Sequence, residues 1–180
     1  MPDSKLSHED LRKIAIQWLK ARTVPYKSGP PRGGRCSIVA SELVSAATDT
    51  PDAIGWDSYG KSILIECKAS RSDFRVDGCK PRSKVGEGMG SQRYYLAERG
   101  VIPTNEVPED WGLLETSRDG KYVECAVRAP SRELPAVEQC NEKLILMSLI
   151  RRINKREFLI IQAEEMDEIL SSNPEAGDGV

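Results

Sequence analysis

The segment Ser62-Ile-Leu-Ile-Glu-Cys-Lys68 decides the fold of this 180-residue chain. Its apolar run, Ile63–Ile65, is typical of a strand that is covered on both faces of a sheet. Because side chains alternate along a strand, Glu66 and Lys68 are expected on one face and Cys67 on the other. Two charged groups at the end of a buried strand need partners or a function.

A second carboxylate stands shortly before this strand. Asp49-Thr-Pro-Asp52 has the composition of a turn, and Ala53-Ile-Gly-Trp56 follows it as another predicted strand. A neighbouring strand that begins at Asp52 can bring its carboxylate within metal-sharing distance of Glu66. Two carboxylates and a backbone carbonyl suit a hard cation such as Mg²⁺. The adjacent Lys68 can orient or deprotonate water and offset charge that develops on a phosphate.

The remaining elements predict an α/β fold. A capping box formed by Ser7 and Asp10 begins an amphipathic helix over residues 8–21. Further strands are expected at 36–44, 93–97, 111–115 and 122–127, a short helix at 70–77, and C-terminal helices at 138–155 and 157–171. The spacing of the first three strands predicts a meander. The order as a whole predicts a mixed central sheet flanked by helices, followed by the C-terminal helices.

Composition predicts one globular domain over residues 1–171 and a disordered acidic tail at 172–180. No apolar run is long enough to span a bilayer, and the N-terminus lacks the pattern of a signal peptide, so we expect a cytoplasmic protein without membrane contact. Five irregularly spaced cysteines, no C-x-x-C pair and a single histidine argue against a zinc site.

Charge is unevenly distributed, although the formal net charge is only −2. Residues 20–35 contain five basic side chains and no acidic ones, residues 68–93 are also rich in basic side chains, and residues 157–180 contain seven acidic ones and no basic ones. Basic segments of this kind can bind phosphate, or they can simply be solvated loops. The candidates for nucleic-acid contact are Arg71, Arg75, Lys80 and Arg93.

Pro51-Asp52 and Glu66-Cys67-Lys68 together resemble the signature of the PD-(D/E)XK nuclease superfamily, which includes restriction enzymes, resolvases and DNA-repair nucleases. The expected order of helix, three strands, helix and strand is similar to the core of that superfamily. The stretch Lys68-Ala-Ser-Arg-Ser-Asp-Phe-Arg-Val-Asp77 resembles the segment after the lysine in the MmcB-like DNA-repair group and in related phage-type proteins. The resemblance covers residues 36–116 and implies a restriction-endonuclease-like core.

The resemblance also implies roles for individual residues. Asp52 and Glu66 would ligate Mg²⁺, or Mn²⁺ in its place, and the backbone carbonyl of Cys67 would add a ligand. Lys68 would be the catalytic lysine. Many members add a glutamate from the first helix, for which Glu9 is the best-placed candidate, and Glu42 on the first predicted strand is its rival. A carboxylate in the first turn of a helix can equally serve only to complement the helix dipole.

The function implied is that of a Mg²⁺-dependent deoxyribonuclease, which hydrolyses phosphodiester bonds of DNA in repair, recombination or phage DNA processing. The alternative is a non-catalytic DNA-binding or assembly module on the same fold. The sequence leaves open whether the substrate is DNA or RNA, how many metal ions bind, and whether the chain forms a homodimer or joins other DNA-processing proteins.

Overall fold

The computed structural model describes residues 5–21, 33–43, 47, 50–78 and 88–152. Helix α1 (His8–Lys20) begins at the predicted capping box. The Asp10 N–H donates to Ser7 Oγ at 3.1 Å, and the Ser7 N–H donates to Asp10 Oδ2 at 3.1 Å. The buried residues Leu11, Ile14, Ala15, Trp18 and Leu19 lie on the helix face that the sequence pattern predicts.

Six strands form one mixed sheet in the order β1-β2-β3-β4-β5-β6. Their bounds are β1 (Ile38–Ala40), β2 (Ala53–Trp56), β3 (Ser62–Cys67), β4 (Gln92–Glu98), β5 (Gly112–Thr116) and β6 (Val123–Val127). Strands β1, β2 and β3 form an antiparallel meander, β3, β4 and β5 run parallel, and β6 returns antiparallel to β5. The predicted α/β class, mixed sheet and meander are therefore confirmed.

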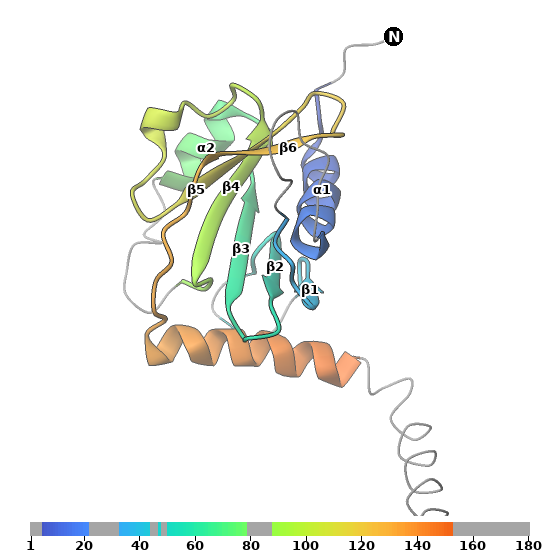
Figure 1. The fold of residues 1–180 in the computed structure, drawn as a ribbon, viewed down its shortest axis with the longest axis vertical. Coiled ribbons are helices and arrows are strands. Elements are labelled where there is room, and N and C mark those ends of the chain that lie inside the picture. The colour runs from blue at the N-terminus through green and yellow to red at the C-terminus, as the bar shows by residue number, and fades with distance from the viewer. Residues whose placement is uncertain (1–4, 22–32, 44–46, 48–49, 79–87, 153–180) are drawn as a thin grey trace, which may run out of the picture.

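Helices flank the sheet on different sides. Helix α1 lies on one face, and α2 (Arg71–Gly78) belongs to the crossover between the parallel strands β3 and β4 (Figure 1). The 3₁₀ helix η1 (Thr104–Glu106) lies between β4 and β5. A further helix over residues 136–152 crosses the end of the sheet at which β3 begins (Figure 1). The predicted helix at 157–171 and the predicted tail at 172–180 lie outside the described residues.

Each face of the sheet buries an apolar core. Ile65 and Cys67 of β3 belong to the core beneath α1, together with Leu11 and Leu19. Leu64 belongs to the opposite core, which includes residues of α2 and of the helix at 136–152. The alternation predicted along β3 therefore holds. None of the described helices is long and apolar enough to cross a membrane.

The first strand is shorter than predicted. It covers Ile38–Ala40 rather than residues 36–44. Arg35 and Glu42 have φ angles of 57° and 45°, in the left-handed region, so the extended backbone ends on both sides of β1. The predicted strand was too long because the apolar pattern of residues 36–44 does not show where the backbone leaves the extended conformation.

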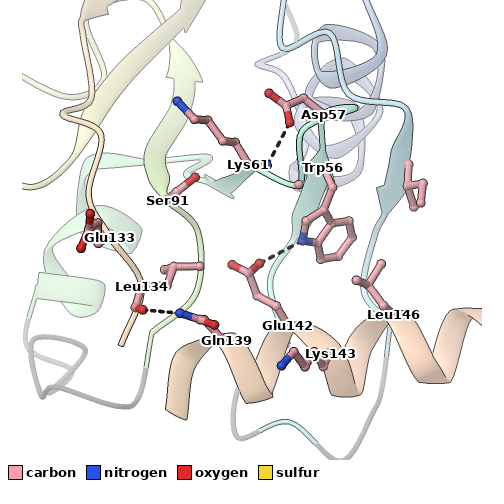
Figure 2. Close-up of a pocket in the computed structure, with 12 residues that line it drawn as sticks. Trp56, Asp57, Lys61, Ser91, Glu133, Leu134, Gln139, Glu142, Lys143 and Leu146 are labelled. Atoms are coloured by element: carbon pink, nitrogen blue, oxygen red, sulfur yellow. Dashed lines mark hydrogen bonds between the residues drawn. The ribbon is translucent and has the colours of Figure 1, made fainter. Parts of the chain in front are cut away.

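Glu142 connects the helix at 136–152 to the sheet. Its carboxylate is buried. Glu142 Oε2 accepts a hydrogen bond from Trp56 Nε1 at 2.9 Å (Figure 2). Glu142 Oε1 accepts from Ser62 Oγ at 2.7 Å and from the Gly90 N–H at 2.8 Å. One carboxylate thus receives donors from β2, β3 and the approach to β4, and it holds the helix against the start of β3.

Replacing Glu142 with alanine should lower the free energy of unfolding by about 2–4 kcal/mol, because buried donors lose their acceptor. The matched control is Glu133→Ala, since Glu133 lies near Glu142 but is exposed. The control should change stability by no more than about 0.5 kcal/mol. Urea denaturation measures both values, and equal stabilities for the two variants would contradict the structural role of Glu142.

Candidate functional site

Asp52 lies at the start of β2, beside the end of β3. The register pairs Ala53 with Ile65, and continuing it by one residue sets Asp52 opposite Glu66. Asp52 Oδ2 accepts a hydrogen bond from the Cys67 N–H at 2.8 Å, which holds the carboxylate against β3. Strand pairing therefore places Asp52 beside Glu66, the two acidic residues that the sequence pairs.

Glu66 and Lys68 form a buried ion pair at this end of the sheet. Their residues are 3% and 5% exposed. Lys68 Nζ lies 3.6 Å from Glu66 Oε2 and 5.8 Å from the centroid of the Tyr95 ring. Removing two charges from water costs several kcal/mol, which their mutual attraction offsets only in part. β3 therefore ends in a pair of charges that folding alone does not require.

Two basic side chains from α1 also reach this region, and neither was predicted from the sequence. His8 Nε2 lies 3.3 Å from Asp52 Oδ2. Arg12, one helical turn later, forms ion pairs with Glu9 and Glu42. The spacing of four residues indicates that His8 and Arg12 share a helix face. Nothing in the sequence indicates that this face turns toward the start of β2.

The two predicted additional acids meet at Arg12. Glu9 lies in the first turn of α1, and its carboxylate also lies 3.5 Å from Lys13 Nζ. Glu42 was predicted on the first strand, but it lies two residues beyond the end of β1. The structure therefore pairs both acids with basic side chains of the chain itself.

The Cys67 thiol points into the core beneath α1, away from the Glu66 and Lys68 side chains. Burial raises its pKa, and the nearby carboxylates of Asp52 and Glu66 raise it further, while Lys68 and Arg12 act in the opposite direction. This environment favours the protonated thiol, which is a poor nucleophile. The main chain of Cys67, by contrast, lies beside Asp52, to which its N–H donates.

The donor set at this end of the sheet fits a hard cation. Asp52 and Glu66 offer carboxylate oxygens, and Cys67 offers a peptide carbonyl. Within the described part of the chain, no group of three or more His, Cys, Asp or Glu side chains is arranged to hold a metal ion. Mg²⁺ commonly binds through one or two carboxylates and keeps several of its waters, whereas Zn²⁺ sites use three or four protein ligands. The oxygen atoms of Asp52, Glu66 and the Cys67 carbonyl are of the kind that Mg²⁺ and Mn²⁺ prefer.

The predicted phosphate contacts fall into different environments. Arg71 and Arg75 lie on α2, which follows directly after Lys68, and both are exposed. Arg71 forms an ion pair with Glu106. Lys80 lies outside the described residues.

Arg93 is enclosed by the protein. It lies on β4, is buried, and forms an ion pair with Asp110. Its guanidinium carbon lies 5.3 Å from the centroid of the Trp111 ring. Burial lowers the pKa of Arg93, and the neighbouring Arg132 lowers it further. The structure thus gives Arg93 internal partners, and its guanidinium is less accessible than those of the α2 arginines.

A groove of about 590 Å³ lies at the opposite end of the sheet, between the turn after β2 and the helix at 136–152 (Figure 2). Its walls include Trp56, Lys61, Leu134, Lys143 and Leu146. Of the predicted site residues that the structure describes, none lines this groove. The length of β3 separates this groove from Glu66 and Lys68.

Comparisons with known proteins add little to this geometry. Neither a protein-family model nor a curated protein matches the sequence. Among solved structures, the chain is similar to a protein of unknown function from Silicibacter pomeroyi, with 23% identity over 79% of this chain and 84% of that chain, and a TM-score of 0.48. A similarity this distant, to a protein of unknown function, carries no argument about activity.

Proposed function

We propose that this chain is a Mg²⁺-dependent nuclease of the PD-(D/E)XK type, which hydrolyses phosphodiester bonds of DNA on a restriction-endonuclease-like core. The observation that carries the proposal is the convergence of Asp52, Glu66 and Lys68 where β2 begins and β3 ends. The antiparallel meander followed by parallel strands is compatible with such a core.

Each of the three residues has a distinct task in this proposal. Asp52 and Glu66 hold the divalent cation, with the Cys67 carbonyl as a further ligand. When bound, the cation supplies Lewis acidity, which makes water a stronger nucleophile and offsets charge on the phosphate. Lys68 already lies beside Glu66, so its ammonium group can hold the attacking water and stabilise the negative charge that develops on the phosphate.

The burial of Glu66 and Lys68 supports a chemical role. Replacing a buried ion pair by apolar side chains of similar volume is often neutral or stabilising, so stability alone gives no reason for this pair. Low exposure also strengthens electrostatic interactions with a reacting phosphate. A pair of charges at the margin of a core is therefore better explained by catalysis than by folding.

Substituting Asp52→Asn, Glu66→Gln or Lys68→Met should each lower Mg²⁺-dependent nicking of supercoiled DNA by about a hundredfold or more, as expected for groups that stabilise the transition state. Asn at position 52 keeps an acceptor for the Cys67 N–H, so the strand pairing should survive. Glu133→Gln, at the opposite end of the sheet, is the control and should nick at the native rate. Initial rates on agarose gels, with EDTA added to parallel samples, provide the measurement.

Nicking at the native rate by all three variants, with unchanged thermal unfolding, would refute the assignment of the site. A native protein that binds DNA without cleaving it in either Mg²⁺ or Mn²⁺ would instead support the non-catalytic DNA-binding module.

The exposed arginines of α2 should contribute to DNA affinity. In an Asp52→Asn background, which separates binding from cleavage, Arg71→Ala and Arg75→Ala should each weaken binding and reduce the slope of log K against log salt by about 1, because each removes one phosphate contact. Arg151→Ala is the control, since Arg151 is exposed on the helix at the far end of the sheet. Fluorescence anisotropy at several salt concentrations measures the slopes. If only Arg151→Ala changed the slope, DNA would bind near the helix over residues 136–152 rather than near α2, and the proposal would be contradicted.

A further inference from the structure

One guanidinium binds two carboxylates close to the candidate site. Arg12 Nη2 pairs with Glu9 Oε2, and Arg12 Nη1 pairs with Glu42 Oε2. The Arg12 side chain is 19% exposed, whereas those of Glu9 and Glu42 are 48% and 51% exposed. The cation is therefore the sheltered centre of this cluster, and it joins α1 to the segment after β1.

The Arg12 cluster adjoins the carboxylates of the proposed metal site. His8 lies one helical turn before Arg12, and its Nε2 atom is 3.3 Å from Asp52 Oδ2. Arg12 also lies close enough to Cys67 to lower the pKa of the thiol, and the Cys67 N–H donates to Asp52. The face of α1 that carries His8 and Arg12 therefore turns toward the start of β2 and the end of β3.

An arginine in this position is a permanent positive charge, because its guanidinium does not lose its proton in proteins. Glu9 and Glu42 bind the two terminal nitrogens of one planar group, so a single guanidinium is the partner of both carboxylates. Two carboxylates that share one cation repel each other once it is removed, and they would then favour binding another cation or a proton.

We propose that Arg12 is a built-in cation that permanently occupies Glu9 and Glu42, so that the site takes a single divalent ion, at Asp52 and Glu66. The inference rests on the metal site of the proposed function. It removes both predicted additional acids from the ligand set of the native protein. Arg12 is then a positioning residue. It neutralises the carboxylates of Glu9 and Glu42, as a second metal ion would otherwise do.

Counting bound Mn²⁺ by electron paramagnetic resonance tests this inference directly. The native protein should bind one Mn²⁺ ion, and Arg12→Gln should bind two, because Glu9 and Glu42 become available. Lys13→Gln is the matched control: Lys13 also pairs with Glu9, but its loss leaves the Arg12 guanidinium in place, so one ion should bind. Adding Glu42→Gln to Arg12→Gln should return the count to one.

A further variant and a second measurement test whether misfolding of Arg12→Gln could explain the result. In the native background, Glu42→Gln should still bind one Mn²⁺ ion with unchanged affinity, since Glu42 is not a ligand there. Mn²⁺ should also raise the melting temperature of Arg12→Gln more than that of the native protein, because a second ion stabilises the folded state.

The outcomes separate this inference from the proposed function. Two ions on the native protein, or loss of its single ion in Glu42→Gln, would overturn the role of Arg12. One ion on a folded Arg12→Gln variant would also overturn it, while leaving Asp52 and Glu66 as the metal site. No ion on the native protein and one on Arg12→Gln would support the masking by Arg12 and reject the proposed site at Asp52 and Glu66.

Discussion

The antiparallel pairing of β2 with β3 is the constraint on which the candidate site depends. It sets Asp52 opposite Glu66, and the hydrogen bond from the Cys67 N–H to Asp52 Oδ2 fixes one carboxylate against the neighbouring strand. A slip of one residue would exchange the faces of every side chain on β3 and would send Glu66 into the core beneath α1. The cost of placing the Glu66 carboxylate in that apolar core therefore opposes the slip.

Charge balance is the second property of this end of the sheet. Each carboxylate lies beside a basic side chain: Asp52 beside His8, Glu66 beside Lys68, and Glu9 and Glu42 beside Arg12. The positive charges of Lys68 and Arg12 reduce the repulsion among these carboxylates, so such a cluster can fold without a metal ion. A divalent cation that binds Asp52 and Glu66 would replace their contacts with His8 and Lys68. Because the carboxylates are already in place, little reorganisation would be needed.

The sequence predicted those features that arise from local periodicity. The capping box of α1, the meander and the alternation along β3 follow from patterns within a few residues, and the structure confirms them. The left-handed backbone at Arg35 and Glu42, the orientation of α1 toward Asp52 and the enclosure of Arg93 by Asp110 and Trp111 depend on tertiary packing. Contacts between distant segments leave no periodic signal in the sequence. The contacts of His8 with Asp52 and of Arg12 with Glu42 were therefore not predicted, although both residues lie on a correctly predicted helix.

The measurement that tests the central claim most directly is the anomalous diffraction of crystals soaked in Mn²⁺. The proposed function predicts a peak between the carboxylates of Asp52 and Glu66, with the backbone carbonyl of Cys67 and ordered water completing the coordination, as expected for an octahedral ion. A peak confined to other carboxylates, or no peak in crystals of the native protein at millimolar Mn²⁺, would contradict a metal-dependent nuclease site at the end of β3.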